Sequence, residues 1–115
     1  MSLSIDEIKI IQKQFDLEHS VKGKGFYCDI NEANIRELEH LAVCLTGELG
    51  EFCNLLKKVV RGDLKLDETK EEMSEELADC FIYLIKISNQ FNVDIEEEFL
   101  KKLDKNKTRF DKSIK

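Results

Sequence analysis

Proline and tryptophan are absent from this sequence, and only five glycines punctuate its 115 residues. Strand-like alternation of apolar and polar residues is too scarce to build a sheet. No apolar run approaches the roughly 20 residues that a membrane span requires, and acidic and basic residues interrupt the first apolar positions, unlike a signal peptide. We therefore expect an all-α, soluble, cytoplasmic protein with no membrane partner.

An excess of positive charge is also missing. The formal net charge is −6, and no basic stripe stands out, so a nucleic-acid polymer is a poor candidate partner. The four cysteines form no CxxC pair, which favours free thiols over structural zinc or a disulfide framework. A hydrophobic fraction of 42% beside a charged fraction of 37% is too apolar for disorder and fits amphipathic helices.

The length fits one domain, residues 1–115, with a core of modest size. We predict four helices, over about residues 4–19, 32–61, 69–91 and 94–109, with a glycine-containing loop at 22–27. Gly62 suits the end of the second helix. Capping pairs mark three helix starts: Ser4 with Glu7, Thr69 with Glu72, and Asp94 with Glu97.

Short connections between these helices predict a compact four-helix bundle. The apolar residues of the third helix cover well over half its circumference, which is wider than a surface helix needs. We therefore expect this helix to be central, or to be buried against a second subunit.

The most informative residues are two acidic pairs, Glu48-x-x-Glu51 in the second helix and Glu76-x-x-Asp79 in the third. A three-residue spacing places both side chains of a pair on one helix face, so each pair can act as a claw around a cation. An antiparallel return of the third helix would bring the claws face to face. Carboxylates gathered beside apolar surface need cations, and ligands that are all oxygen suit Mg²⁺, with Mn²⁺ as a substitute.

Other interpretations of these patterns stay open. An acidic pair also occurs by chance on a solvated helix face, and a wide apolar helix would serve a non-enzymatic helical interaction module. A carboxylate-bridged di-iron bundle needs two Glu-x-x-His motifs, of which Glu37-x-x-His40 is one and Asp16-x-x-His19 a degenerate second. Composition and spacing by themselves therefore predict a Mg²⁺-binding helical protein and nothing more specific.

Three segments resemble the MazG-type nucleotide pyrophosphohydrolases of the all-α NTP pyrophosphatase superfamily, whose pattern is ExxE…ExxD. The first two are LAVCLTGELGE, residues 41–51, and EELADCFIYL, residues 75–84. The third is KLDKNKTRF, residues 102–110, which is similar to a family tail in which lysine, asparagine and arginine precede an aromatic residue. The resemblance covers about residues 32–110.

The resemblance implies a four-helix fold that forms a homodimer or homotetramer, with its active site near a subunit interface. It implies Mg²⁺-dependent cleavage of a nucleoside triphosphate, with a deoxynucleoside form expected, to the monophosphate and pyrophosphate. A phosphoribosyl-ATP pyrophosphohydrolase-like activity is the alternative within the superfamily. The implied metal-binding and catalytic residues are Glu48, Glu51, Glu76 and Asp79, and the implied substrate-binding residues are Lys102, Asn106, Arg109 and His40.

The chain departs from many relatives in the residues that contact the nucleobase. It lacks the tryptophans and the proline-containing segment that help to hold the nucleobase in those relatives. Phe26 and Tyr27 either stack on the base or pack against the bundle. Among the carboxylates we favour Glu48 as the acceptor of the attacking water's proton, since its position is the more apolar.

Overall fold

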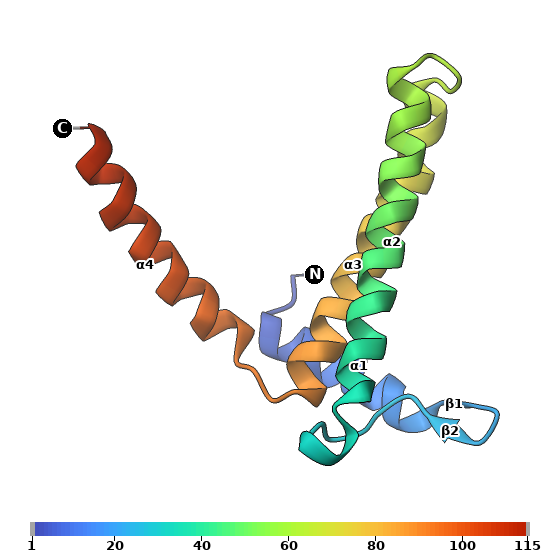
Figure 1. The fold of residues 1–115 in the computed structure, drawn as a ribbon, viewed down its shortest axis with the longest axis vertical. Helices are drawn as coiled ribbons and strands as arrows, with labels where there is room; N and C mark the ends of the chain where they lie inside the picture. The colour runs from blue at the N-terminus through green and yellow to red at the C-terminus, as the bar shows by residue number, and fades with distance from the viewer. Residues whose placement is uncertain (1, 115) are drawn as a thin grey trace.

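The computed structural model describes the backbone of residues 2–114 and the side chains of residues 2–111. Its four α-helices, shown in Figure 1, are α1 (Ile5–Glu18), α2 (Arg36–Val60), α3 (Leu66–Gln90) and α4 (Ile95–Ile114). An antiparallel hairpin of β1 (Ser20–Val21) and β2 (Lys24–Gly25) and a 3₁₀ turn, η1 (Glu32–Asn34), connect α1 to α2. The all-α prediction is confirmed, and the short hairpin lies where the sequence pattern indicated a loop.

Side-chain caps set two of the helix starts as predicted. The Ser4 hydroxyl oxygen accepts a hydrogen bond from the Glu7 backbone N–H at 3.1 Å, and Glu7 Oε1 accepts one from the Ser4 N–H at 3.1 Å. At the start of α4, Asp94 Oδ1 accepts from the Glu97 N–H at 3.1 Å. Both caps satisfy backbone donors that have no partner within the helix.

The predicted start of α3 at Thr69 is wrong. The helix begins at Leu66, and Thr69 lies inside its first turn, where the buried hydroxyl donates to the Lys65 carbonyl oxygen at 2.7 Å. The physical reason is the tight reversal just before it. The backbone N–H groups of Asp63 and Leu64 both donate back to the last turn of α2, so the chain has already turned when it reaches Leu66.

Gly62 produces that reversal. Its φ angle is +88°, in the left-handed region that side chains with a Cβ rarely adopt. The Gly62 N–H donates to the Val59 carbonyl oxygen at 3.1 Å and the Asp63 N–H donates to that of Lys58 at 2.9 Å, which together form a Schellman motif. As a result α3 returns antiparallel to α2 along its length (Figure 1).

Helix α3 is central, as its wide apolar surface predicted. It packs along α2 on one side and crosses α1 on another (Figure 1). The buried hydrophobic residues among those described are few: Leu41 of α2 and Met73 and Ile85 of α3 are 6%, 8% and 3% exposed. One chain therefore builds a thin core around the α2–α3 pair.

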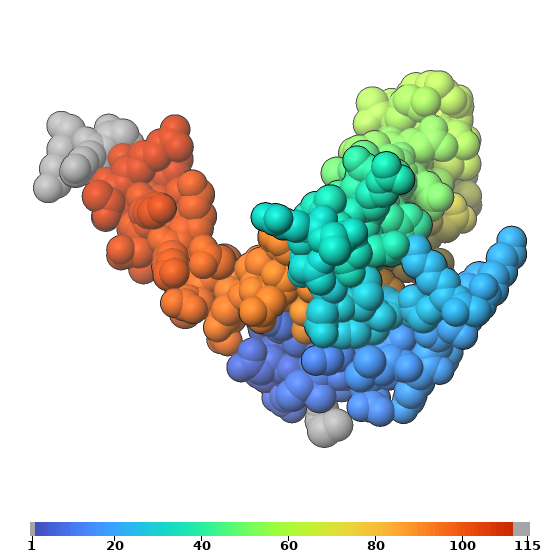
Figure 2. Space-filling view, turned by 60° about the horizontal axis from the view of Figure 1, so that its bottom comes forward, coloured from blue at the N-terminus to red at the C-terminus, as the bar shows by residue number. Residues whose placement is uncertain are grey.

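Helix α4 stands apart from the other helices. Figures 1 and 2 show it extending from the end of α3 with an open space between it and the α2–α3 pair. The radius of gyration is 17.6 Å, whereas a compact domain of this length has a value of about 13 Å. Phe99 and Leu100 of α4 are 62% and 56% exposed. A single chain thus has the four predicted helices but does not close them into a compact bundle, because the apolar row of α4 finds no cover within it.

Exposed apolar side chains also continue over α2 and α3. Leu49 of α2 and Leu77 and Phe81 of α3 are 49%, 49% and 41% exposed. None of the described helices combines the length and the apolar character needed to cross a membrane.

Candidate active site

The two acidic pairs meet where α2 and α3 run side by side. Glu48 of α2 and Glu76 and Asp79 of α3 each offer a carboxylate oxygen, and these three oxygens all lie within 4.8 Å of one another. All three side chains are half-buried. The antiparallel return of α3 therefore brings Glu48 of the first acidic pair together with both residues of the second pair.

The close approach of these carboxyl groups changes the pKa of one of them. The pKa of Glu76 is raised to about 7, first by a hydrogen bond with the Glu48 carboxyl and next by one with Glu51. The Oε2 atoms of Glu48 and Glu76 are buried and have no hydrogen-bond partner within residues 2–111. Desolvated carboxylate oxygens without a partner are strongly disfavoured, and a divalent cation among them would remove both the desolvation cost and the repulsion. The carboxylate oxygens of this cluster therefore fit the ligands of a metal ion.

Glu51 borders the cluster without belonging to the closest set. Its side chain is exposed, and it lies one turn beyond Glu48 on α2, close enough to Glu76 to contribute to that residue's raised pKa. Its position fits a ligand at the open side of the cluster.

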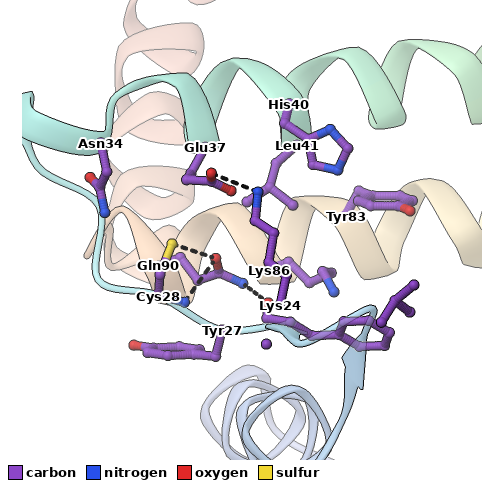
Figure 3. Close-up of a pocket in the computed structure, with 13 residues that line it drawn as sticks. Lys24, Tyr27, Cys28, Asn34, Glu37, His40, Leu41, Tyr83, Lys86 and Gln90 are labelled. Carbon is purple, nitrogen blue, oxygen red and sulfur yellow. Dashed lines mark hydrogen bonds and ion pairs between the residues drawn. The ribbon is translucent and has the colours of Figure 1, made fainter.

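A cavity of about 660 Å³ opens beside the N-terminal part of α2 (Figure 3). The hairpin and the segment after it form one wall, and α2 and α3 form the other. The lining residues are Val21, Lys24, Gly25, Phe26, Tyr27, Cys28, Asn34, Glu37, His40, Leu41, Tyr83, Lys86 and Gln90.

Tyr83 connects this cavity to the carboxylates. It lines the cavity and lies one helical turn after Asp79. Its pKa is raised, chiefly by burial and then by the neighbouring Cys44, Glu48 and Asp79. Tyr83 therefore lies next to both features, although the cluster carboxylates are not among the residues that line the cavity.

The two aromatic residues of the loop have different surroundings. The Phe26 ring faces the Lys86 ammonium, with 5.1 Å between Nζ and the ring centroid. The Tyr27 hydroxyl instead donates to Asp29 Oδ1 at 3.0 Å, and Lys13 lies over the Tyr27 ring at 5.0 Å. Both rings therefore line the cavity, and Phe26 is the one that lies beside Lys86.

The remaining candidate residues divide between two places. His40 lines the cavity, is exposed, and has its Nε2 atom 3.7 Å from Cys44 Sγ. On α4, Lys102 and Arg109 are exposed and Asn106 is half-buried, and the Arg109 guanidinium lies 5.1 Å from the Phe110 ring centroid. Because α4 diverges from α2 and α3 (Figure 1), one chain does not bring these three residues to its own carboxylates.

Sequence reasoning did not single out Lys86, which lies in the cavity wall. One signal was available, since Lys86 is a lone cation in the apolar stretch 80–87 of α3. In the structure Lys86 Nζ donates to Asp16 Oδ1, and this partner could not be inferred from the local sequence because it is 70 residues away.

The fold and site first define a class: an all-α protein in which two antiparallel helices present an acidic cluster able to bind a metal ion beside an open cavity. A sequence model of the MazG nucleotide pyrophosphohydrolase domain matches residues 36–113, which include α2, α3 and nearly all of α4. The chain belongs to this family.

The chain also resembles one curated protein of a bacteriophage. Gene 37 protein of Mycobacterium phage L5 is 28% identical over 83 residues, which cover 70% of this chain and 73% of the phage protein. No solved structure matches the chain.

Proposed function

We propose that this protein hydrolyses a nucleoside triphosphate, with the deoxynucleoside form expected, to the monophosphate and pyrophosphate. Membership of the MazG family supports nucleotide pyrophosphohydrolase activity. The observation that carries the proposal is the convergence of Glu48, Glu76 and Asp79, whose oxygens lie within 4.8 Å of one another while two carboxylate oxygens of the cluster are buried without partners.

The cation in this proposal is Mg²⁺, held by Glu48, Glu76 and Asp79 with Glu51 at the open side. Ligands that are all oxygen suit this ion, and Mn²⁺ would substitute for it. When bound, it would neutralise triphosphate oxygens and make the α-phosphorus more electrophilic.

The protein's own part in the reaction is positioning and proton transfer. Phosphoryl-type displacement requires mainly a fixed substrate and neutralised charge. The carboxylate cluster fixes one end of the triphosphate, and the adjoining cavity holds the nucleoside, with Phe26 and His40 beside it. We assign Glu48 as the acceptor of the attacking water's proton, because it is half-buried and borders the apolar face of α2.

The phosphate-binding residues Lys102, Asn106 and Arg109 act in this proposal from a second copy of the chain. They are spaced four and three apart, so they form one row on α4, and a lysine, an amide and a guanidinium suit phosphate oxygens. The exposed apolar residues of α4, α2 and α3 support pairing, because so much uncovered apolar surface on one chain is typical of an interface. We propose a homodimer, or a tetramer made of two such dimers.

The direct test is release of pyrophosphate with Mg²⁺ from a panel of ribonucleoside and deoxynucleoside triphosphates, with phosphoribosyl-ATP in the same panel. We expect release from one or more of the triphosphates, and none without a divalent cation. A helical interaction module without activity would give a different result: Mg²⁺ would change neither its thermal stability nor its binding of nucleotides. That result would refute the hydrolase proposal.

A further inference from the structure

The innermost charged group of the cavity wall is the ammonium of Lys86. Its side chain is 13% exposed, and its Nζ atom donates to Asp16 Oδ1 at 3.0 Å. The Asp16 side chain, behind it on α1, is fully buried. The same Nζ atom lies 5.1 Å from the centroid of the Phe26 ring and 5.8 Å from that of Tyr83. The ammonium therefore lies near both aromatic rings, and Asp16 is its counter-ion.

Lys86 has hydrogen-bond donors to spare. An ammonium carries three N–H groups, and in the described part of the chain Asp16 is its one hydrogen-bond acceptor. Figure 3 shows the Lys86 side chain at the wall of the cavity, near Tyr83. Donors of a nearly buried charge that lack acceptors carry a desolvation cost, which a cavity occupant with a hydrogen-bond acceptor would relieve.

Three other polar side chains of the wall already have partners. Lys24 Nζ lies 2.8 Å from Glu37 Oε1, so these opposite charges are paired at the more exposed side of the cavity. The amide of Gln90 is used by the backbone of the wall itself, since Nε2 donates to the Phe26 carbonyl oxygen at 3.0 Å and Oε1 accepts from the Cys28 N–H at 3.4 Å. Among these charged residues Lys86 is the least exposed, and one of its three N–H groups is used by Asp16.

The charge of the pair indicates the kind of acceptor. Asp16 neutralises Lys86, so the pair as a whole offers hydrogen-bond donors without net positive charge. Such a site suits a neutral acceptor, such as a carbonyl oxygen, better than a phosphate, which would meet the Asp16 carboxylate behind the cation. The Tyr83 ring suits a planar occupant, whereas the Phe26 ring is already stacked on His19 with 6.2 Å between the ring centroids.

From these contacts we infer that Lys86 selects nucleotides whose base carries a ring carbonyl oxygen, by donating a hydrogen bond to that oxygen, and that Asp16 is the residue that positions the ammonium. Guanine, hypoxanthine and the pyrimidines carry such an oxygen, whereas adenine does not. The inference rests on the proposed function in one respect, because it places the nucleoside end of the substrate in this cavity.

A matched pair of nucleotides tests the inference without any hydrolysis. The α,β-methylene analogues of dITP and dATP resist cleavage, and their bases differ at C6, where a carbonyl oxygen replaces an amino group, and at N1, which carries a hydrogen only in hypoxanthine. Binding of both, in the presence of Mg²⁺, is measured by calorimetry for the wild-type protein and for the double variant Asp16→Asn with Lys86→Met. The double variant removes both charges, so that neither is left buried alone. Lys24→Met is the control, since Lys24 lines the same cavity but is paired with Glu37 at its exposed side.

We expect the wild-type protein and Lys24→Met to bind the dITP analogue about ten- to a hundredfold more tightly than the dATP analogue, which is the range for one hydrogen bond to a charged group. The double variant is expected to bind the two equally. Equal binding of the two analogues by the wild-type protein would overturn the inference, whether or not the double variant folds. A preference for the dITP analogue that survives in the double variant would also overturn it. Pyrophosphate release from dITP and dATP is measured separately. Preferential binding without release would refute the hydrolase alone, and release without preference would refute the role of Lys86 alone.

Discussion

The ammonium of Lys86 and the carboxylate of Asp16 form a buried ion pair that joins α3 to α1. The donor and acceptor atoms are 3.0 Å apart, and Gln12 Nε2 donates to the same Asp16 oxygen at 3.1 Å. Asp16 Oδ2 has no hydrogen-bond partner among the described residues. Such a pair is costly to break from one side, because the remaining charge stays in the interior without compensation.

Single substitutions of this pair should therefore destabilise the fold. We expect Asp16→Asn or Lys86→Met to lower the free energy of unfolding by about 3–5 kcal/mol each, and the double variant to lower it by clearly less than the sum. Urea denaturation of the four proteins measures the coupling. Additive losses would show that the two charges do not depend on each other.

Removal of a carboxylate from the cluster should separate activity from stability. Glu48→Gln is expected to slow pyrophosphate release by about 10²–10⁴-fold, because the proton acceptor is lost. Asp79→Asn should also abolish most turnover, and both variants should stay helical by circular dichroism. Glu75→Gln is the matched control, since Glu75 is exposed and lies beside Glu76 on α3. Full activity in both cluster variants would contradict the mechanism.

The raised pKa of Glu76 predicts a particular dependence of stability on pH. In the metal-free fold this carboxyl has a pKa of about 7, against an ordinary value of 4.5, so the folded protein holds a proton that the unfolded chain has released between these values. The stability from this group is therefore complete below about pH 4.5 and is lost as the pH rises through 7. Added Mg²⁺ competes with this proton, so it should raise the melting temperature more at pH 8 than at pH 6. Thermal melts of Glu76→Gln provide the control, because that variant should lose both effects.

Mixing two inactive variants tests whether α4 of one copy completes the site of another. Glu76→Gln disables the carboxylate cluster and Arg109→Ala disables the phosphate-binding row. In a dimer whose sites are shared, each mixed dimer contains one site that is wild-type in both parts, so a random equimolar mixture should recover about a quarter of wild-type activity. Recovery is measured as pyrophosphate release after the two variants have exchanged subunits. A site contained in one chain would show no recovery at all.

Gly62 offers a test of the α2–α3 turn. Its φ angle of +88° disfavours any Cβ, although a Cβ added there would meet no atom within 4 Å. Gly62→Ala should therefore lower the free energy of unfolding by about 1 kcal/mol through backbone strain alone, and Gly62→Asn by less, since asparagine tolerates this conformation better. Thermal and urea unfolding of the two variants compare these costs. Equal losses would mean that the φ angle is not the cause.

Local spacing explains why so much of the helical fold could be predicted. The cap at Ser4, the stop at Gly62 and the wide apolar surface of α3 depend on residues close together in the sequence, and each is present as expected. The predicted cap at Thr69 was wrong, because two backbone hydrogen bonds to the end of α2 complete the turn before Leu66. The approach of Glu48 to Glu76 could be anticipated as well, since it follows from helix periodicity and an antiparallel return.

The sequence alone determined the presence of four helices and the faces on which the acidic pairs stand, since these depend on side-chain spacing within a few turns. Several helix bounds were predicted wrongly: α2 begins at Arg36 rather than about residue 32, α3 at Leu66 rather than 69, and α4 continues to Ile114 rather than about 109. Only the tertiary structure decided that Lys86 meets Asp16 across 70 residues, that Phe26 rather than Tyr27 lies beside Lys86, and that α4 diverges from α2 and α3. The physical reason is that these relationships depend on the angles at which helices pack and on the path of the connecting segments. Periodicity along a single helix carries no information about either.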